Sequence, residues 1–245
     1  MKKSLIIIAL LPLLAAAQQQ PSLYFSTDDM PNAAIFLPAP PDSNSHAFVY
    51  DITQYMWGKA QRQSERGRMA VSQATISIAE MARQFSQAFG MDISPKGTPA
   101  IFRVLERGIP TLRLGATRPK DAYMRRRPYC QFNEPTSLPN EEEELRNTGS
   151  YPSGHTVRGW GMALLLSEIN PDAQDALLKL GYEWGQSRVI AGYHWQSDVD
   201  AGRLLASACY ARLHSSKEFL SDMAKARKEY TRLRRQQKNN ISATP

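Results

Sequence analysis

Residues 170–184 read NPDAQDALLKLGYEW, and this stretch indicates most directly which kind of fold the chain adopts. Asn170 followed by Pro171 is typical of a helix start, because proline at the first helical position lacks only an N–H that would have no partner there. The apolar residues that follow recur three or four positions apart, as they do on one face of a helix. They are Ala173, Ala176, Leu177, Leu180 and Trp184. The stretch therefore predicts an amphipathic α-helix.

The same period recurs on both sides of this stretch. The residues that carry it are Val71, Ala74, Ile78, Met81, Phe85 and Phe89 in one stripe, Ile101, Val104 and Leu105 at the start of another, and Val199, Gly202, Ala206, Cys209 and Leu213 in a third. No segment alternates convincingly between apolar and polar residues, as a strand would. We therefore predict an all-α fold, a single-domain helical bundle with an active site at helix ends and loops near residues 110–154 and 188–193.

The first residues have the order of a secretory signal peptide. Lys2 and Lys3 precede an apolar run over residues 5–14, and three alanines at 15–17 provide a cleavage site. The run is too short to span a bilayer, so we expect cleavage after Ala17, with a retained anchor as the alternative.

The rest of the chain divides into a lead-in and one domain. Residues 18–47 are rich in Gln, Pro, Asn and Ser, which predicts an extended lead-in, and a helical domain is expected over residues 48–245. No later stretch is long and apolar enough to cross a membrane, so the mature protein is expected to be soluble.

The basic excess lies mainly near the C-terminus. The chain has a formal net charge of +7, and much of it comes after residue 216. Apolar residues share one face of this segment and basic residues follow, namely Phe219, Met223, Ala226 and Tyr230, then Arg232, Arg234, Arg235 and Lys238. We interpret it as an amphipathic helix with a solvated cationic face, in preference to a nucleic-acid-binding patch.

The chain has two cysteines, Cys130 and Cys209. An exported chain meets an oxidising compartment, in which the two can form one disulfide. Two separate buried thiols fit the sequence about equally well.

Three short segments concentrate residues suited to phosphate chemistry. The first contains Lys120 and, seven positions later, Arg127 followed by proline. The second is residues 149–156, GSYPSGHT, immediately before an apolar helical run. The third runs from Ser187-Arg188 through a histidine to Asp198.

These segments supply what a bound phosphoryl group needs. Its negative charge spreads over three oxygens, so a protein without a metal needs several fixed cations and N–H donors. Lys120, Arg127 and Arg188 provide three cations, and each arginine fork matches two oxygens. Ser153 and Gly154 open a predicted helix whose free N–H groups can point at the anion, and glycine lets the backbone approach closely.

Two histidines and one aspartate can carry out the chemistry. His194 and Asp198 are four positions apart, so on a helix they share one face, and the carboxylate can accept from the Nδ1–H of the imidazole. Nε2 is then free to attack phosphorus. His155 can protonate the leaving alkoxide and later activate the water that hydrolyses a phosphohistidine. This set needs no metal ion or other cofactor.

Each segment by itself has another interpretation. The cations can be solvated charges, and residues 152–154 can be a simple turn into a helix. His194 with Asp198 can be a structural pair or two metal ligands. A metal needs a third and usually a fourth ligand, and the four histidines have no tight Cys or carboxylate cluster around them, so we predict no metal site.

The joint order of the segments resembles the three-part signature of the phosphatidic acid phosphatase type 2 and vanadium haloperoxidase superfamily. That order is Lys, six residues, Arg-Pro; then Pro-Ser-Gly-His; then Ser-Arg, five residues, His, three residues, Asp. Residues 149–156 further resemble the bacterial class A non-specific acid phosphatases, as do residues 37–41, 65–67 and 181–183. The likeness covers nearly all of the chain after residue 17.

The resemblance implies a role for each matching residue. It implies that His194 is the nucleophile, Asp198 its orienting partner and His155 the general acid. It implies that the phosphate is held by Lys120, Arg127, Ser153, Gly154 and Arg188.

The resemblance also implies the wider function. The fold is expected to be all-helical, the location periplasmic and the assembly a homo-oligomer. The expected substrates are phosphate monoesters such as nucleotides, sugar phosphates and aryl phosphates, with phosphate transfer to nucleosides as a further activity. No cofactor is expected, and neither nucleic acid nor membrane is expected as a partner.

One segment departs from the usual members. Residues 130–146 do not resemble them and contain four consecutive glutamates at 141–144. We interpret the glutamates as a solvated loop, and the alternative is an element that edges the pocket and alters substrate choice.

Two other functions are kept as alternatives. A vanadate-dependent haloperoxidase would hold vanadate in the same anion cradle. A non-catalytic basic protein would use the cations to bind polyanions, and its affinity would fall steeply with salt.

Overall fold

The chain folds as a set of helices around one buried helix. The computed structural model describes residues 22–242 and shows helices and turns but no strand in that range, so the predicted all-α fold is confirmed. The elements are α1 Ala33–Phe36, α2 His46–Gln61, α3 Glu65–Ser72, α4 Ile78–Phe89, α5 Pro99–Leu114, α6 Thr117–Tyr123, α7 Pro128–Phe132, η1 Pro139–Glu141, α8 Glu142–Arg146, α9 Gly154–Ile169, η2 Pro171–Ala173, α10 Gln174–Ala191, α11 Gln196–Leu213 and α12 Lys217–Ser242.

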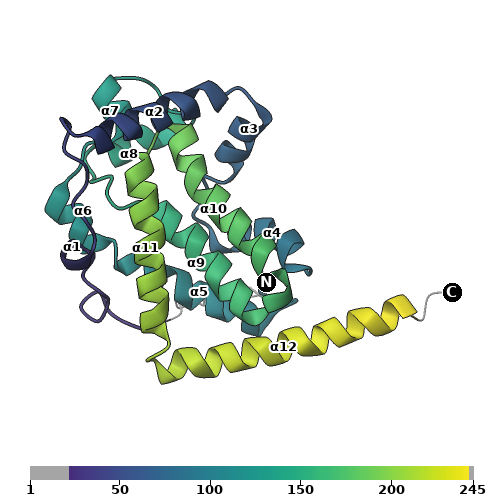
Figure 1. The fold of residues 1–245 in the computed structure, drawn as a ribbon. Coiled ribbons are helices and arrows are strands. Elements are labelled where there is room, and N and C mark those ends of the chain that lie inside the picture. Colours follow the sequence, from purple (N-terminus) through teal and green to yellow (C-terminus); the bar gives the residue numbers. More distant parts are fainter. Residues whose placement is uncertain (1–21, 243–245) are drawn as a thin grey trace, which may run out of the picture.

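The buried helix is α9, which packs against α5, α10 and α11 (Figure 1). Glycine allows α9 and α10 to approach closely, because a Cβ on Gly159 would lie 2.4 Å from Cδ1 of Trp184. The short η2 connection makes these two helices antiparallel neighbours. The start of α9, the end of α10 and the start of α11 therefore meet at one end of the bundle.

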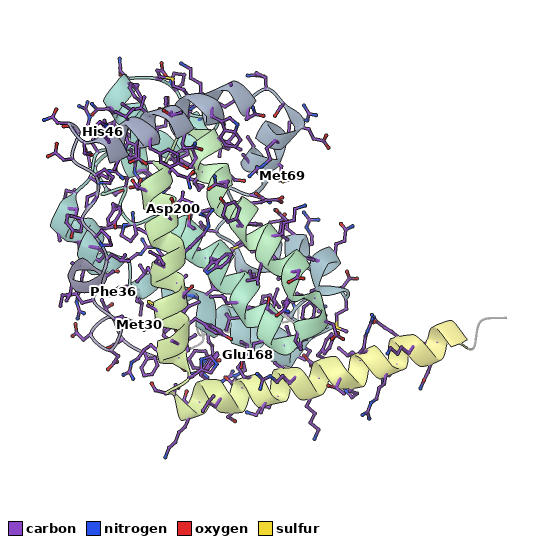
Figure 2. All side chains as sticks on the ribbon, viewed as in Figure 1. Met30, Phe36, His46, Met69, Glu168 and Asp200 are labelled. Carbon is purple, nitrogen blue, oxygen red and sulfur yellow. The ribbon has the colours of Figure 1, made fainter. Side chains whose placement is uncertain are left out.

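The last helix, α12, lies across the opposite end and extends beyond the bundle (Figure 1). Its first half buries Phe219, Met223 and Ala226, and its later basic residues are exposed, which confirms the predicted amphipathic helix. Glu168 lies near the end of α9 (Figure 2). Arg227 of α12 forms an ion pair with it.

The described part of the lead-in, residues 22–47, consists largely of turns and bends, and it includes the single turn α1 and the first two residues of α2. It is held to the bundle by buried side chains at Tyr24, Met30 and Leu37. The predicted signal peptide and its cleavage after Ala17 lie outside the described residues. Between residues 22 and 242, no helix combines the length and the apolarity needed to cross a membrane.

Some predicted element boundaries are wrong. The stripe over residues 71–89 is divided between α3 and α4, because the chain leaves the helix at Gln73 and restarts where the Ser77 side chain accepts from the N–H of Glu80. The predicted loop near 110–154 contains the end of α5 and the short helices α6, α7 and α8. These helices are too short for an apolar period to be visible.

The second predicted loop, 188–193, is also shorter than expected. α10 continues to Ala191 and ends at Gly192, which has φ +91°. This left-handed conformation costs glycine little, so the chain turns here without strain.

Cys130 and Cys209 are free thiols. They are buried in two separate apolar clusters, so of the two alternatives from the sequence the structure has separate buried thiols. Burial raises the pKa of Cys209 to about 12, as expected for a thiol that packs as an apolar side chain.

Candidate active site

A cavity of about 670 Å³ lies where the ends of α9, α10 and α11 meet. Its polar lining consists mainly of basic side chains and two histidines, namely Arg113, Lys120, Arg127, Arg158, Arg188, His155 and His194. Apolar side chains form other parts of the wall, among them Val71, Ala74, Ile76, Leu138 and Leu145. The cavity therefore combines a strongly positive interior with room for more than a phosphate group.

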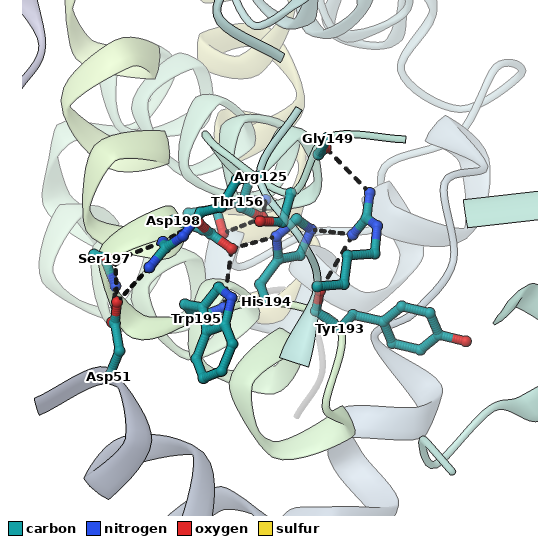
Figure 3. Close-up of polar contacts among 12 residues, drawn as sticks. Asp51, Arg125, Gly149, Thr156, Tyr193, His194, Trp195, Ser197 and Asp198 are labelled. Carbon is teal, nitrogen blue, oxygen red and sulfur yellow. Dashed lines mark hydrogen bonds and ion pairs between the residues drawn. The ribbon is translucent and has the colours of Figure 1, made fainter. Parts of the chain in front are cut away.

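His194 lies in the turn between α10 and α11, so it does not share a helix with Asp198 as predicted. Asp198 is the third residue of α11, and its Oδ2 accepts from the backbone N–H of Trp195 at 2.9 Å, which caps the helix. The same oxygen lies 3.2 Å from Nδ1 of His194 (Figure 3). The expected contact is thus present, but helix capping creates it.

The neighbours of His194 fix its tautomer. Nη1 of Arg127 lies 3.3 Å from Nε2 (Figure 3), and a guanidinium can only donate, so Nε2 accepts. Nδ1 therefore carries the proton that Asp198 accepts. Burial lowers the pKa of His194 well below its usual value, and the charges of Arg127 and Lys120 lower it further. The ring is a neutral imidazole with a lone pair at Nε2.

A buried arginine that we did not predict as a site residue supports Asp198. Arg125 donates through Nη1 to Oδ1 of Asp198 at 2.6 Å and through Nη2 to Oδ2 of Asp51 at 2.7 Å (Figure 3). Ser197 also donates to Asp51, from its backbone N–H at 2.8 Å. In the sequence Arg125 is one of three adjacent arginines, and nothing there distinguishes it from the exposed Arg126.

Lys120 is anchored by backbone carbonyls in the loop before α9. Its Nζ donates to the carbonyl of Gly149 at 2.5 Å and to that of Ser150 at 3.3 Å. Burial lowers the pKa of Lys120 well below its usual value, and the nearby charges of Arg127 and Arg113 lower it further. A bound anion would favour its charged form.

The end of α8 and the loop that follows it anchor Arg127. Its Nε donates to the carbonyl of Leu145 at 3.0 Å and its Nη2 to Oγ1 of Thr148 at 2.9 Å. These bonds fix the plane of the guanidinium beside His194. The predicted cations in this segment are therefore held in place and are not solvated charges.

Arg188 is buried and only partly paired. Its Nη2 donates to Oε2 of Glu141 at 3.4 Å, while Nε and Nη1 have no hydrogen-bond partner. Its guanidinium lies over the Tyr193 ring at 4.2 Å from the centroid. Burial lowers the pKa of Arg188, and the Glu141 carboxylate opposes that shift. Buried charged donors without partners are costly, so this side chain is suited to receive an anion.

The start of α9 offers further donors. The side chain of Ser153 accepts from the N–H of Thr156 at 3.2 Å, so Ser153 is the N-cap. The N–H groups of Gly154 and His155 have no acceptor within the helix. Gly154 lines the cavity, whereas the fully buried Ser153 is not among the lining residues.

His155 is oriented by a residue that sequence reasoning missed. Its Nε2 lies 2.7 Å from the backbone carbonyl of Gln73, and a carbonyl only accepts, so Nε2 carries a proton and Nδ1 is the free ring nitrogen. Burial lowers the pKa of His155 well below its usual value, and the charges of Arg188 and Arg158 lower it further. No local sequence signal marks Gln73, because it approaches His155 from the end of α3.

The glutamates at 141–144 are not simply a solvated loop. Glu141 pairs with Arg188, and both Glu141 and Glu144 line the cavity. Our preferred interpretation was therefore wrong for these two side chains, and the alternative of a segment that edges the pocket fits. In residues 22–242 no three His, Cys, Asp or Glu side chains are grouped so that they could hold a metal ion.

Comparison with known proteins gives consistent matches. Residues 109–220 match the PAP2 superfamily. The chain is 44% identical over 218 residues to a non-specific acid phosphatase of Providencia stuartii, covering 88% of each chain. It is 40% identical over 248 residues to a non-specific acid phosphatase of Salmonella typhi, covering 98% of this chain and 95% of that one. It is also 34% identical over 200 residues to an acid phosphatase of Zymomonas mobilis, covering 82% of this chain and 76% of that one.

Proposed function

We propose that this chain, which belongs to the non-specific acid phosphatases of the PAP2 superfamily, hydrolyses phosphate monoesters through a phosphohistidine at His194. The chain is an acid phosphatase, and its substrates are small phosphate esters. One observation carries the proposed mechanism: Nε2 of His194 presents a lone pair beside Arg127 in a cavity that Arg188 also lines with unpaired donors.

In the proposed complex, the phosphate occupies the positive end of the cavity. Lys120, Arg127 and Arg188 contact its oxygens, together with the N–H groups of Gly154 and His155 at the start of α9. Ser153 is retained as a proposed phosphate ligand through its hydroxyl proton, and its contact with Thr156 fixes the helix start. These groups stabilise the charge that the three equatorial oxygens carry during transfer.

The first step transfers the phosphoryl group to the protein. The Nε2 lone pair of His194 attacks phosphorus, the ester P–O bond breaks, and the leaving oxygen takes a proton from Nδ1 of His155. Asp198 accepts a hydrogen bond from Nδ1–H of His194 and so stabilises the positive charge that develops on this ring. The alcohol then leaves.

The second step releases phosphate. Water attacks phosphorus and gives a proton to Nδ1 of His155, the P–N bond breaks, and the electron pair returns to Nε2 of His194. Inorganic phosphate leaves with His155 protonated for another cycle.

The protonation states require the substrate. In the free protein the low pKa of His155 leaves the ring mostly neutral at neutral pH. A bound phosphate adds negative charge beside the ring and raises its pKa, so the acid form becomes available in the complex. Acidic solution favours the same form, which is consistent with an acid phosphatase.

The proposal also includes the location of the protein, its oligomeric state and a phosphotransfer activity. The order of residues 1–17 supports export to the periplasm. The family resemblance supports a homo-oligomer and phosphate transfer to nucleosides. A cavity of about 670 Å³ leaves space for an acceptor alcohol beside the phosphate.

The test is to trap the intermediate. The mature protein, with chelator present, is mixed with ³²P-labelled phosphate monoester and quenched within milliseconds. We expect an acid-labile, base-stable label on the unsubstituted protein and on a control, His46→Ala, whose exposed histidine is outside the cavity. His194→Ala should show no label and no turnover of an aryl phosphate. Near-normal turnover by His194→Ala would end the assignment.

Vanadate distinguishes the remaining enzyme alternative. We expect it to inhibit phosphate release without supporting halide oxidation by peroxide. Peroxide-driven halide oxidation would instead favour the haloperoxidase.

A further inference from the structure

Two arginines in the cavity are not used by the proposed mechanism. Arg113 belongs to the last turn of α5 and Arg158 to the second turn of α9, and both line the cavity. In the part of the chain that the structure describes, neither side chain makes a hydrogen bond or an ion pair. Arg125, by contrast, is paired with two buried aspartates.

The two guanidinium groups lie beside the phosphate end of the cavity. A Cβ on Gly154 would lie 2.3 Å from Nε and 2.8 Å from Cζ of Arg113, so this guanidinium covers the first residue of α9. Arg158 is four positions after Gly154, on the same face of the helix and about 6 Å farther along its axis. The pair therefore extends the positive surface away from the helix start.

The charges of this pair repel each other. Burial lowers the pKa of Arg158 to about 10, and the charge of Arg113 contributes to that shift. Burial also lowers the pKa of Arg113, and the nearby Asp121 carboxylate opposes that shift without forming an ion pair. Both side chains are still charged at neutral pH. Two adjacent, half-buried guanidinium groups that have no hydrogen-bonded or ion-paired acceptor are suited to bind a further anion.

The phosphate at His194 does not require this extra charge. Three cations, Lys120, Arg127 and Arg188, and the start of α9 already surround it. With these two arginines included, the basic side chains that line the cavity are Arg113, Lys120, Arg127, Arg158 and Arg188. The carboxylates among the lining residues are Glu141 and Glu144, and Glu141 is paired with Arg188. Five basic side chains thus face two carboxylates in the lining, and the Asp121 carboxylate also acts on Arg113 from outside it.

We propose that Arg113 and Arg158 form a second anion subsite, and that the preferred substrates are phosphate monoesters carrying a second phosphate or a carboxylate a few bonds from the ester. This inference rests on the proposed function, because it assumes that the ester phosphate binds at His194. The Arg113 guanidinium lies at Gly154 and Arg158 is one helical turn farther along α9, so the second anion is expected within a few bonds of the ester. Arginine forks bind either kind of anion through paired N–H groups.

Matched substrate pairs test this subsite. 3-Phosphoglycerate and glycerol 3-phosphate differ by a carboxylate, and fructose 1,6-bisphosphate and fructose 6-phosphate differ by a phosphate. Release of inorganic phosphate gives kcat/KM for each, and we expect the doubly anionic member of at least one pair to be preferred. The pair that responds identifies the second group as carboxylate, phosphate or both.

Substitution of the subsite should remove the preference. In Arg158→Gln the ratio of kcat/KM within the responding pair should fall about tenfold, mainly through KM, because a charge-assisted contact is lost. Arg158→Lys should keep most of the ratio, since it keeps the charge, and Arg113→Gln should act like Arg158→Gln. The control is Arg68→Gln, an exposed arginine on α3 that does not line the cavity, and it should leave the ratio unchanged.

Three results would overturn the subsite. The first is that the unsubstituted protein does not prefer the doubly anionic substrate of either pair. The second is that the ratio of kcat/KM stays unchanged in both glutamine variants. The third is that kcat/KM falls equally for both members of each pair, which would place the arginines at the ester phosphate.

Failure of the proposed function gives a different result. p-Nitrophenyl phosphate would then not be hydrolysed, or His194→Ala would hydrolyse it normally. In that case calorimetry measures the dissociation constants of both members of each pair, for the unsubstituted protein and for Arg158→Gln. The subsite predicts that the doubly anionic member binds more tightly and that this preference falls about tenfold in Arg158→Gln. Equal preferences in the two proteins would overturn it.

Discussion

Arg125 and Asp198 form a buried ion pair directly behind His194, with Nη1 of the arginine 2.6 Å from Oδ1 of the aspartate. Asp198 is fully buried and uses its other oxygen for His194 and for the cap of α11. Nη2 of Arg125 lies 2.7 Å from Oδ2 of Asp51, so one guanidinium joins α2 to the start of α11. The orientation of His194 therefore depends on a side chain that does not line the cavity.

Removal of this guanidinium should affect both folding and catalysis. Arg125→Met leaves two buried carboxylates without their cation, so the free energy of unfolding should fall by about 3 kcal/mol or more. Asp198 would also hold His194 less firmly, and kcat should fall at least about tenfold. Urea unfolding and turnover of an aryl phosphate measure the two effects.

Two further variants separate these effects. Arg126→Met removes the exposed neighbouring charge and should change neither quantity. Asp51→Asn leaves the pair between Arg125 and Asp198 in place, so it should affect stability more than kcat. If Arg125→Met behaved like Arg126→Met, the ion pair would have no part in positioning His194.

Gly154 should be required for anion binding more than for folding. A Cβ there would lie 2.3 Å from Nε of Arg113, and this long side chain can move aside at a small cost. Gly154→Ala should therefore lower the free energy of unfolding by only about 1 kcal/mol. It should raise KM for phosphate esters severalfold, because the displaced arginine and the added methyl group alter the cavity wall.

The same substitution five positions later is the matched control. A Cβ on Gly159 would lie 2.4 to 2.6 Å from Cδ1, Cγ and Cβ of Trp184, which is fully buried. Gly159→Ala should lower the free energy of unfolding by about 3 kcal/mol. Trp184 stacks on the ring of His155 and not on the groups proposed to hold the phosphate, so KM of the folded protein should change less than in Gly154→Ala. Equal effects of the two variants on KM would show that Gly154 has no special role.

The sequence predicted which of these side chains lie together in one cavity better than it predicted the helix boundaries. The spacing of Lys120, Arg127, Arg188 and the two histidines was informative because residue type and order together are rarely matched by chance. Arg113 and Gln73 could not be identified in that way. They reach the site through the packing of α5 against α9 and the end of α3, and such contacts leave no local pattern in the chain.

The contacts of Ser153 illustrate the same limit. The motif places it beside Gly154, and sequence reasoning treats both as phosphate ligands. The structure turns the Ser153 side chain toward Thr156 as a helix cap, whereas Gly154 lines the cavity. Adjacent motif residues therefore differ in their contacts, and only the backbone conformation at the helix start distinguishes them.

The low pKa of His194 predicts how activity depends on acidity. Its cause is burial first and then the positive charges of Arg127 and Lys120. Protonation of Nε2 abolishes the nucleophile, so activity is lost as pH falls through this pKa. The acid limb of kcat/KM should therefore lie well below pH 6.5, the usual pKa of histidine. Lys120→Met removes one cation, which raises the pKa of His194 and should move the limb to higher pH.

The position of the limb is measured with one aryl phosphate throughout, so that titration of the substrate is common to all variants. Lys96→Met removes an exposed charge outside the cavity and should leave the limb in place. A limb that stayed fixed in Lys120→Met, or moved to lower pH, would contradict the electrostatic origin of the shift.

His155 should matter more as the leaving group becomes worse. An alkoxide needs a proton in the transition state, whereas p-nitrophenolate departs without one, so loss of a general acid is selective. For His155→Ala we expect kcat/KM to fall about 10² to 10⁴-fold with glycerol 3-phosphate and much less with p-nitrophenyl phosphate. The control is His214→Ala, because His214 contacts Glu168 at the far end of α9. Because the phosphate contacts are the same in both substrates, a binding defect would lower both rates equally, and such a result would remove His155 from the acid role.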